Sequence, residues 1–340
     1  MSTLDRHEFF INGTALDRQK APIAKIMIDL SVEKADSFSL TISPADELTA
    51  GSVDVGDPIE IKIADQNNTS VTVFKGFVTT ITEELPEDGD HQVIVEGMDG
   101  SFKMMKGIKS RSWAKMKHSD VVSSIIGEHG LTAGTVTATT ITYDFLEQNQ
   151  VSDYQFVSWL AVMNGFEFFV NLGKVYFRKP HQNVTASKTF TWGENIIHLT
   201  RTIDLIDQVG EVKVRGYDFK TKQAVLGTSS EVTMVGGSKS KTGKQLLNSA
   251  FGTKTDETWS EVISQADAKL QADSIAYYHG SKLVSGRLKV FGDPNIQAGN
   301  YVQIEKAGGL NGIYYIVSAV HTLDDDDGYM TEIHLGGTSI

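Results

Sequence analysis

The sequence predicts an α+β, mainly β protein with more than one domain. Three observations predict it: short stretches in which apolar and polar residues alternate, 31 glycines against 6 prolines, and a length of 340 residues. Alternation with period two marks strands with one buried face, and frequent glycine suits tight turns between them. A chain of this length has room for two or three cores.

The first hundred residues are predicted to form strands. The alternation is clearest at residues 36–43, 58–63, 71–81 and 91–96. Clusters of Gly, Asn, Asp and Ser lie between these stretches, as expected for turns. Short strands at this spacing indicate a small barrel or sandwich.

The middle of the chain mixes helix and strand. Ser152 and Gln155 have the spacing of a capping box, in which each side chain bonds the other residue's backbone N–H, and Gly165 suits the end of the helix that follows. Residues 166–170 and 175–177 are predicted to form a hairpin. This region is therefore α+β.

The last 150 residues return to strands, with one helix expected among them. The strands are predicted at residues 211–214, 287–290, 301–304, 313–320 and 329–335. A second capping box is expected at residues 258–261, followed by an apolar stripe of Trp259, Val262, Ile263, Ala266 and Leu270. Residues 235–254 are rich in Gly, Ser, Lys and Thr and are expected to form a mobile loop. Two β-rich ends around a mixed middle suggest a distant structural duplication.

Composition excludes several classes of function. The chain has no cysteine, so it forms no disulfide, thiolate metal site or cysteine nucleophile. A formal net charge of −12 disfavours general binding to nucleic acid and suits either plain solubility or a conduit wall that repels acidic cargo. The first ten residues do not resemble a signal peptide, and the apolar run at residues 314–317 is far too short to span a membrane.

A search for reactive motifs finds none that is complete. The glycine- and lysine-rich run at residues 236–244 departs from a phosphate-binding loop, because the final Gly-Lys comes one residue late and Gln245 follows it. The nine histidines show no metal-binding spacing, and His321 and His334 are expected to pack against each other across the last hairpin. We therefore predict no catalytic residue, no cofactor and no metal.

Four consecutive aspartates, Asp324, Asp325, Asp326 and Asp327, precede Gly328. Calcium loops alternate their ligands with other residues, whereas consecutive residues of an extended loop point apart. A solvated hairpin tip is the favoured interpretation, and a weak cation site or a contact with a charged partner is the alternative.

Three ordered segments carry a family resemblance. The first reads F-x-G-x-V-T-x-I around Gly76, and the second runs from Gln150 to Val170. The residues that match are Gly76; then Ser152, Asp153, Phe156, Leu160 and Gly165; then Pro294, Gly299, Gly312, Tyr314, His321, Tyr329 and Thr331. Together they resemble the late control gene D proteins of phages and the N-terminal part of VgrG proteins. These are baseplate hub proteins of contractile tails and phage-tail-like injection particles.

The resemblance implies a fold of two tail-tube-like β-barrels with an inserted α/β domain and a short helical insertion. The first barrel would comprise residues 1–98 and the α/β domain residues 99–187. The second barrel would comprise residues 188–240 and 283–340, with the loop and helix of residues 241–282 inserted into it. The matching residues are turn, cap and core positions, which favours a scaffold over an enzyme.

The resemblance also implies a function and partners. Three copies would form a trimeric adaptor that joins the hexameric inner tube to a trimeric spike. VgrG proteins continue into a spike beyond this region, so a chain that ends at Ile340 implies a separate spike protein. The expected partners are the chain itself, the inner tail-tube protein, the spike and other baseplate proteins, with the tape measure as a further candidate. Assembly is expected in the bacterial cytoplasm, into a virion or an extracellular phage-tail-like particle, without specific binding to nucleic acid or membrane.

Two other structural functions remain as alternatives. A sixfold tail-tube or distal-tail subunit needs only one barrel, so the mixed region of residues 152–177 counts against it. A carbohydrate-binding β-protein on a particle surface needs exposed aromatic platforms. The four tryptophans, Trp113, Trp159, Trp192 and Trp259, are dispersed, and Trp159 and Trp259 are expected on the buried faces of helices.

Overall fold

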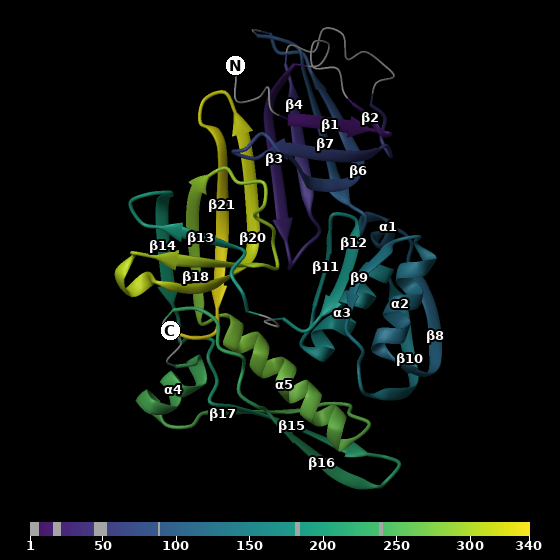
Figure 1. Cartoon of the computed structure of the whole chain (residues 1–340). Helices are drawn as coiled ribbons and strands as arrows, with labels where there is room; N and C mark the ends of the chain where they lie inside the picture. The colour runs from purple at the N-terminus through teal and green to yellow at the C-terminus, as the bar shows by residue number, and fades with distance from the viewer. Residues whose placement is uncertain (1–6, 16–21, 44–52, 88, 181–183, 238–240) are drawn as a thin grey trace.

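The computed structural model describes residues 7–15, 22–43, 53–87, 89–180, 184–237 and 241–340. Strands make up 50% of the structure and helices 18%, which confirms the prediction of a mainly β protein. The chain forms one large sheet and three small ones (Figure 1).

The large sheet has 13 strands and is built from both ends of the chain. Its N-terminal strands are β1 (His7–Ile11), β2 (Thr14–Ala15), β3 (Ile23–Ser31), β4 (Ser37–Ile42), β5 (Pro58–Ala64), β6 (Ser70–Glu84) and β7 (Gln92–Asp99). Its C-terminal strands are β13 (Lys188–Thr191), β14 (Ile196–Ile203), β18 (Val284–Phe291), β19 (Tyr301–Glu305), β20 (Gly312–Asp324) and β21 (Gly328–Gly337). A short 3₁₀ turn, η2 (Gly308–Leu310), precedes β20. The main path runs β14-β18-β21-β20-β3-β4-β7-β6-β5-β1-β2.

The alternating pattern places one face of these strands in a core. In β3, Ile26, Ile28 and Leu30 are buried, while Lys25 and Met27, on the opposite face, are exposed. The N-terminal strands enclose one apolar cluster and the C-terminal strands enclose another. Burial of one face in each cluster fixes the register, because a slip of one residue would exchange the two faces.

The middle of the chain forms a smaller α+β unit with its own core. It contains α1 (Phe102–Met105), β8 (Lys109–Lys117), α2 (His118–Glu128), β9 (Thr132–Val136), β10 (Thr142–Val151), α3 (Asp153–Asn164), β11 (Glu167–Asn171) and β12 (Lys174–Arg178). The predicted capping box is confirmed, because Ser152 and Gln155 bond each other's backbone N–H groups. Gly165 ends α3 with a φ of 63°, and β11 and β12 form the predicted hairpin.

A buried carboxylate holds this unit together. Asp153 accepts hydrogen bonds from Lys109 at 2.6 Å, Arg111 at 2.8 Å and Gln148 at 2.9 Å, and His129 Nε2 lies 2.7 Å from it. Burial alone would raise the pKa of Asp153, but these hydrogen bonds and the charge of Arg111 lower it to about 2. The carboxylate therefore ties β8, β10, α2 and the start of α3 together as an ion.

The segment between β14 and β18 forms a third unit. It contains β15 (Glu211–Asp218), β16 (Gln223–Thr228), α4 (Gly243–Phe251), β17 (Thr255–Trp259) and α5 (Gln265–Ser281), with a small core between the sheet and α5. The predicted capping box at residues 258–261 is wrong. Thr258 and Trp259 instead belong to β17, paired with β15, and the helix begins later, after its N-cap Ser264.

The prediction of a loop over residues 235–254 is also wrong in part, because residues 243–251 form α4. Thr242 and Gln245 form a capping box there, with each side chain bonded to the other residue's backbone N–H. This is the same T/S-x-x-Q signature as at Ser152, and the sequence showed it. Residues 238–240 of the glycine-rich run lie outside the described residues.

A buried ion pair joins the α+β unit to the large sheet. Glu167 in β11 accepts a hydrogen bond from the Tyr315 hydroxyl in β20 and a bond from Arg178 Nε at 3.3 Å. Arg178 also donates to the Gly299 carbonyl at 2.8 Å, just before β19. Burial raises the pKa of Glu167, while Tyr315 and Arg178 oppose that rise. The bonds to Tyr315 and to the Gly299 carbonyl therefore fix the orientation of this unit on the sheet.

Replacing Ser152 with Ala should lower the free energy of unfolding by about 1 kcal/mol, because the helix loses its N-cap. Chemical denaturation followed by circular dichroism measures the change. Ser158→Ala is the matched control on the same helix, since its hydroxyl only donates to the Tyr154 carbonyl one turn back at 2.8 Å. A loss at Ser158 as large as that at Ser152 would contradict the capping role.

Candidate functional site

The candidate site is the open face of the eight central strands, with the two strand edges that bound it. These strands run in the order β14-β18-β21-β20-β3-β4-β7-β6. The side chains opposite the core alternate with the buried ones along most of β3, β4, β7, β18, β20 and β21. On the central strands they are Lys25, Met27, Asp29, Ser37, Ser39, Thr41, Val320, Thr322, Met330, Glu332 and His334. The face is therefore broad, polar and mixed in charge.

A shallow hollow of about 230 Å³ lies on this face near β3, β4, β6 and β7. Its lining includes Met27, Asp29, Ser39, Thr80 and Glu96. Hydroxyl groups and two carboxylates dominate it, so it offers little apolar area for a ligand to bury.

The eight strands consist of one four-strand unit used twice. The order β6-β7-β4-β3 is followed in the same direction by β20-β21-β18-β14. The β6–β7 pairing shifts register at residues 78–80, and the β20–β21 pairing shifts at residues 316–318. The β3–β4 pairing shifts at residues 23–25, and the β14–β18 pairing shifts at residues 196–198. Four irregularities at matching places indicate that β6 corresponds to β20, and β3 to β14.

The turns before β5 and β19 repeat in the same way. Gly56 has a φ of 102° and its N–H donates to the Val78 carbonyl at 2.8 Å. Gly299 has a φ of 83° and its N–H donates to the Ile316 carbonyl at 2.9 Å. Val78 and Ile316 are the residues just before the two register shifts. The two four-strand units therefore correspond residue by residue, with Val78 equivalent to Ile316 and Gly56 equivalent to Gly299. The structural duplication suggested by the sequence is present at the level of backbone pairing.

The two units join edge to edge through β3 and β20. Their antiparallel pairing extends from Ser31 opposite Ser318 to Lys25 opposite Asp324. Val32 N–H continues it by donating to the Val317 carbonyl at 3.1 Å. The pairing makes a single sheet from strands nearly 300 positions apart in the sequence.

Four of the C-terminal residues of the resemblance, His321, Tyr329, Thr331 and Pro294, lie in one cluster beside this joint. His321 Nε2 donates to the Ile296 carbonyl at 3.0 Å. Its Nδ1 lies 2.9 Å from the Tyr329 hydroxyl and 3.2 Å from the Thr331 hydroxyl. Thr331 accepts a bond from Asp293 N–H at 3.2 Å, next to the buried Pro294. Burial lowers the pKa of His321 to about 4, so the ring is neutral.

The other residues of the resemblance serve packing and turns. Phe156 and Leu160 lie in the core of the α+β unit. A Cβ at Gly76 would lie 2.2 Å from the Met98 carbonyl, and one at Gly312 would lie 2.4 Å from the Gly237 carbonyl. Tyr314 is buried and its hydroxyl donates to the Leu310 carbonyl at 2.8 Å.

Two further expectations are corrected by the structure. His321 lies opposite Thr331, and His334 lies opposite Ser318, so the two histidines do not pack together. They occupy opposite faces of the hairpin because their register differs from the one expected. Trp159 is 48% exposed and Trp259 72% exposed, so neither lies on a buried helix face. Trp259 is a strand residue, and Trp159 only stacks on Phe156 from outside.

The exposed face of the β16-β15-β17 sheet carries apolar residues. Arg215 is paired with both Leu226 and Trp259, so these three side chains share the face turned away from α5. Tyr217 lies farther along β15 and Phe219 just after its end, and the two rings contact each other at 5.2 Å between centroids. Sequence reasoning missed this patch because it assigned Trp259 to a helix.

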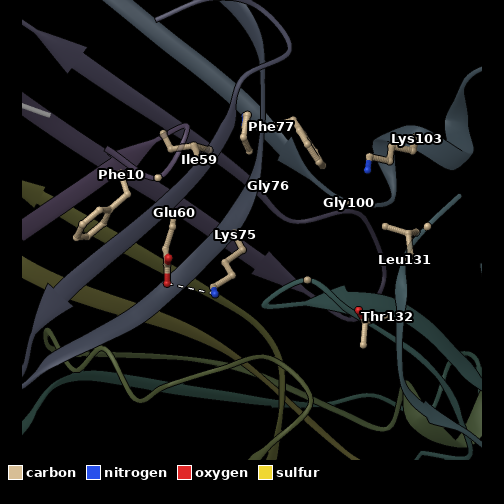
Figure 2. A pocket seen from close by; sticks show the side chains of 14 residues that line it. Phe10, Ile59, Glu60, Lys75, Gly76, Phe77, Gly100, Lys103, Leu131 and Thr132 are labelled. Atoms are coloured by element: carbon tan, nitrogen blue, oxygen red, sulfur yellow. Dashed lines mark ion pairs between the residues drawn. The ribbon is translucent and has the colours of Figure 1, made fainter. Parts of the chain in front are cut away.

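A groove of about 350 Å³ lies where β5 and β6 meet the α+β unit (Figure 2). Figure 2 shows Phe77 and Lys103 on one side and Leu131 and Thr132 below them. Lys103 Nζ lies 4.6 Å from the centre of the Phe77 ring, and Lys75 pairs with Glu60 at 3.3 Å. Gly76 contributes to the groove, so this position has a surface role as well as a packing one.

The aspartate run lies at a hairpin tip, as predicted. It spans the turn between β20 and β21, where Asp327 N–H donates to Asp324 Oδ1 at 2.9 Å. Within the described ranges, no three His, Asp or Glu side chains are grouped to hold a metal ion. No helix in the part of the chain that the structure describes has the length and apolar character needed to cross a membrane.

A family model described as the Alg8 N-terminal domain matches residues 3–325. The chain belongs to this family. The match extends over both units of the large sheet and the two units inserted between their strands, so it covers nearly the whole fold. No curated protein matches the sequence.

Solved structures with a similar fold are phage tail and type VI secretion proteins. The 43 kDa tail protein of prophage MuSo2 from Shewanella oneidensis has a TM-score of 0.72 at 12% identity, over 97% of both chains. A tail protein from Neisseria meningitidis has a TM-score of 0.71 at 14% identity, over 97% of this chain and 95% of that one. The E. coli c3393 protein, a type VI secretion component, has a TM-score of 0.63 at 9% identity, over 97% and 77%. The chain therefore has a phage tail- and baseplate-like fold.

The stability of the protein should fall as pH drops from 6.5 to 4, in part because of His321. The unfolded chain takes up a proton near the ordinary pKa of 6.5, whereas the folded ring resists protonation until about 4. The loss should reach about 3 kcal/mol. Asp99 acts in the opposite direction, because burial raises its pKa to about 6. The His321 contribution is therefore measured as the difference between the wild type and His321→Gln across this pH range.

The control for this measurement is Leu323→Ala. Leu323 is buried on the same face of β20, so its truncation should cost about 2–5 kcal/mol without removing a titrating group. The variant should keep the pH slope of the wild type while His321→Gln flattens it. Equal slopes in His321→Gln and the wild type would contradict the assignment.

Proposed function

We propose that this chain is the baseplate hub of a contractile injection apparatus, a phage tail or a pyocin-like or related particle. The observation that carries the proposal is the duplication of the four-strand unit within one chain. Three copies of such a chain present six equivalent units. An assembly of this kind matches a sixfold tube on one side while keeping threefold symmetry for a spike on the other.

The proposal assigns a role to each part of the chain. Residues 1–98 form one tube-like barrel, and the strands of residues 188–203 and 284–340 form the second, with their open sheet faces lining a passage. The boundary predicted at residue 240 is wrong, because β15 and β16 pair with β17 in a separate sheet that packs on α5. The α/β domain of residues 99–187 and the inserted unit that runs from β15 to α5 project from the barrels and supply contacts to other baseplate proteins. At −12 per copy, a trimer carries −36, three times −12, which suits a passage that does not retain acidic cargo.

The partners follow from the same proposal. They are two further copies of the chain, the inner tail-tube protein, a separate spike protein and other baseplate proteins, in a virion or an extracellular particle. No reaction is proposed. The polar cluster of His321 and Thr331 is 1% and 0% exposed.

One observation favours a second function, carbohydrate binding on a particle surface. Trp259, Tyr217 and Phe219 are exposed at 72%, 41% and 83% on or beside one small sheet. Exposed aromatic faces are what a sugar ring stacks on. A glycan-binding assay with Trp259→Ala as the control variant separates this function from assembly, since the substitution lies far from the large sheet.

Native mass spectrometry of the purified chain over a concentration series tests the hub proposal. The expected result is a dominant species of about three times 37.2 kDa, because each copy supplies two of six units. A hexamer would favour a sixfold tube or distal-tail subunit. A monomer at every concentration would refute self-assembly into a hub.

A further inference from the structure

The two outer strands of the eight-strand sheet leave backbone groups unpaired. Among the described strands, β14 pairs only with β18, and β6 beyond Phe77 pairs only with β7. Thr82, Glu83 and Ile203 on these edges are exposed. A strand edge with free N–H and C=O groups is a template for pairing with another strand, so soluble proteins normally cover it.

The joint within the chain predicts what covers these edges. In the repeated unit, β20 is the equivalent of β6, and β3 is the equivalent of β14. Within the chain β20 already pairs with β3, so the equivalents of β6 and β14 are already joined edge to edge. A β14 strand of one copy therefore fits the β6 strand of another. A second copy carries the complementary edge with the same register shifts.

The correspondence also fixes the register of that contact. Thr80 is the first paired residue beyond the register shift of β6, and Ser318 is the first beyond that of β20. Thr82 and Val320 each lie two residues further on, so they correspond. Thr202 corresponds to Asp29 in the same way, and Val320 pairs with Asp29. Thr82 of one copy should therefore lie opposite Thr202 of the next.

This register matches the chemistry of the side chains on the core face. It places Ile81 opposite Ile203 and Glu83 opposite Arg201, in antiparallel order. The same face brings Leu85, which is 80% exposed in the single chain, against Leu199. An aliphatic pair on each side of an acid–base pair is complementary in both shape and charge.

Other registers lose this match. A slip of one residue turns the apolar side chains to the opposite face of the sheet. A slip of two residues in one direction places Glu83 against Leu199 and Ile81 against Arg201. A slip of two in the other places Glu83 against Ile203.

We propose that β6 of one copy and β14 of the next form an antiparallel seam in which Thr82 lies opposite Thr202. The proposal rests on the hub function, which requires copies of this chain to meet, and specifies the strands and register of their contact. Because different edges of each copy meet, the contact is head-to-tail, and it closes into a ring when the rotation permits.

Paired cysteines test the seam. Val32 N–H donates to the Val317 carbonyl, so these two opposite residues form a hydrogen-bonded pair. Hydrogen-bonded and non-hydrogen-bonded pairs alternate along an antiparallel ladder, which makes Val320–Asp29, three positions further on, a non-hydrogen-bonded pair. Thr82–Thr202 is the equivalent of this pair. Cα atoms in such pairs lie about 4.5 Å apart, within the range for a disulfide. The chain has no cysteine of its own, so Thr82→Cys with Thr202→Cys gives an unambiguous readout. Under mild oxidation the double variant should run as a covalent trimer on a denaturing gel and return to a monomer with reductant.

Three kinds of matched variant control the experiment. Thr82→Cys with Thr200→Cys is off register by two residues on the same face and should cross-link at least about tenfold less. Val320→Cys with Asp29→Cys places the same geometry inside one chain and should form a disulfide that runs as a monomer. Each single variant should stop at a dimer or stay uncross-linked, because one cysteine per copy cannot join three chains.

Charge exchange gives a second and independent readout. Glu83→Lys should raise the dissociation constant of the trimer by at least about tenfold, because it sets two positive charges against each other. Adding Arg201→Glu should recover much of that loss. Failure of the second substitution to recover any association, in a variant with a wild-type circular dichroism spectrum, counts against the acid–base pair and overturns the register.

The outcomes separate the seam from the hub function. A trimer by mass whose cross-links ignore the predicted pair overturns the seam and leaves the hub. Cross-linking that continues to a hexamer supports the seam and overturns the threefold hub. A chain that stays monomeric and uncross-linked at every concentration overturns both.

Discussion

The pairing of β3 with β20 is the constraint on which the rest of the structure depends. It joins Lys25 to Asp324 and Ser31 to Ser318, and so brings the two ends of the chain into one sheet. Everything between β7 and β13, and between β14 and β18, must then leave the sheet and return to it. The α+β unit and the β15–α5 unit are such excursions, and Figure 1 shows both projecting from the same end of the sheet. A long-range joint therefore determines where the local units can lie.

The repeated register shifts give the sheet its shape. A bulge adds a residue on one strand, bends that strand and increases the local twist. Because both four-strand units carry shifts at corresponding positions, both curve in the same way. Because the two units have equal curvature, equivalent units can join edge to edge with the same strand pairing and register. A duplication without these shifts would produce two similar folds without a repeatable joint.

Buried polar groups fix the orientation of the parts. Glu167, Arg178 and Tyr315 connect the α+β unit to β20, and Tyr143 donates to Asp267 at 2.9 Å between that unit and α5. A buried carboxylate or guanidinium is costly unless its hydrogen bonds are complete. These bonds are complete only when the units dock in one orientation. Apolar contacts supply the area of the joints, and these polar groups supply their specificity.

The sequence by itself determined the mainly β class, the helix start at Ser152, its end at Gly165 and the hairpin after it. Each of these depends on neighbours within a few residues, through alternation, capping and turn chemistry. Only the tertiary structure decided the secondary structure at residues 258–261, where a segment with a helix-capping signature includes the end of β17, which pairs with the edge of β15. It also decided that His321 contacts Ile296, Tyr329 and Thr331 and that the two sheet units join at β3 and β20. Backbone pairing with a distant strand outweighs local propensity, because it satisfies many hydrogen bonds at once, and no local pattern specifies which strand will supply them.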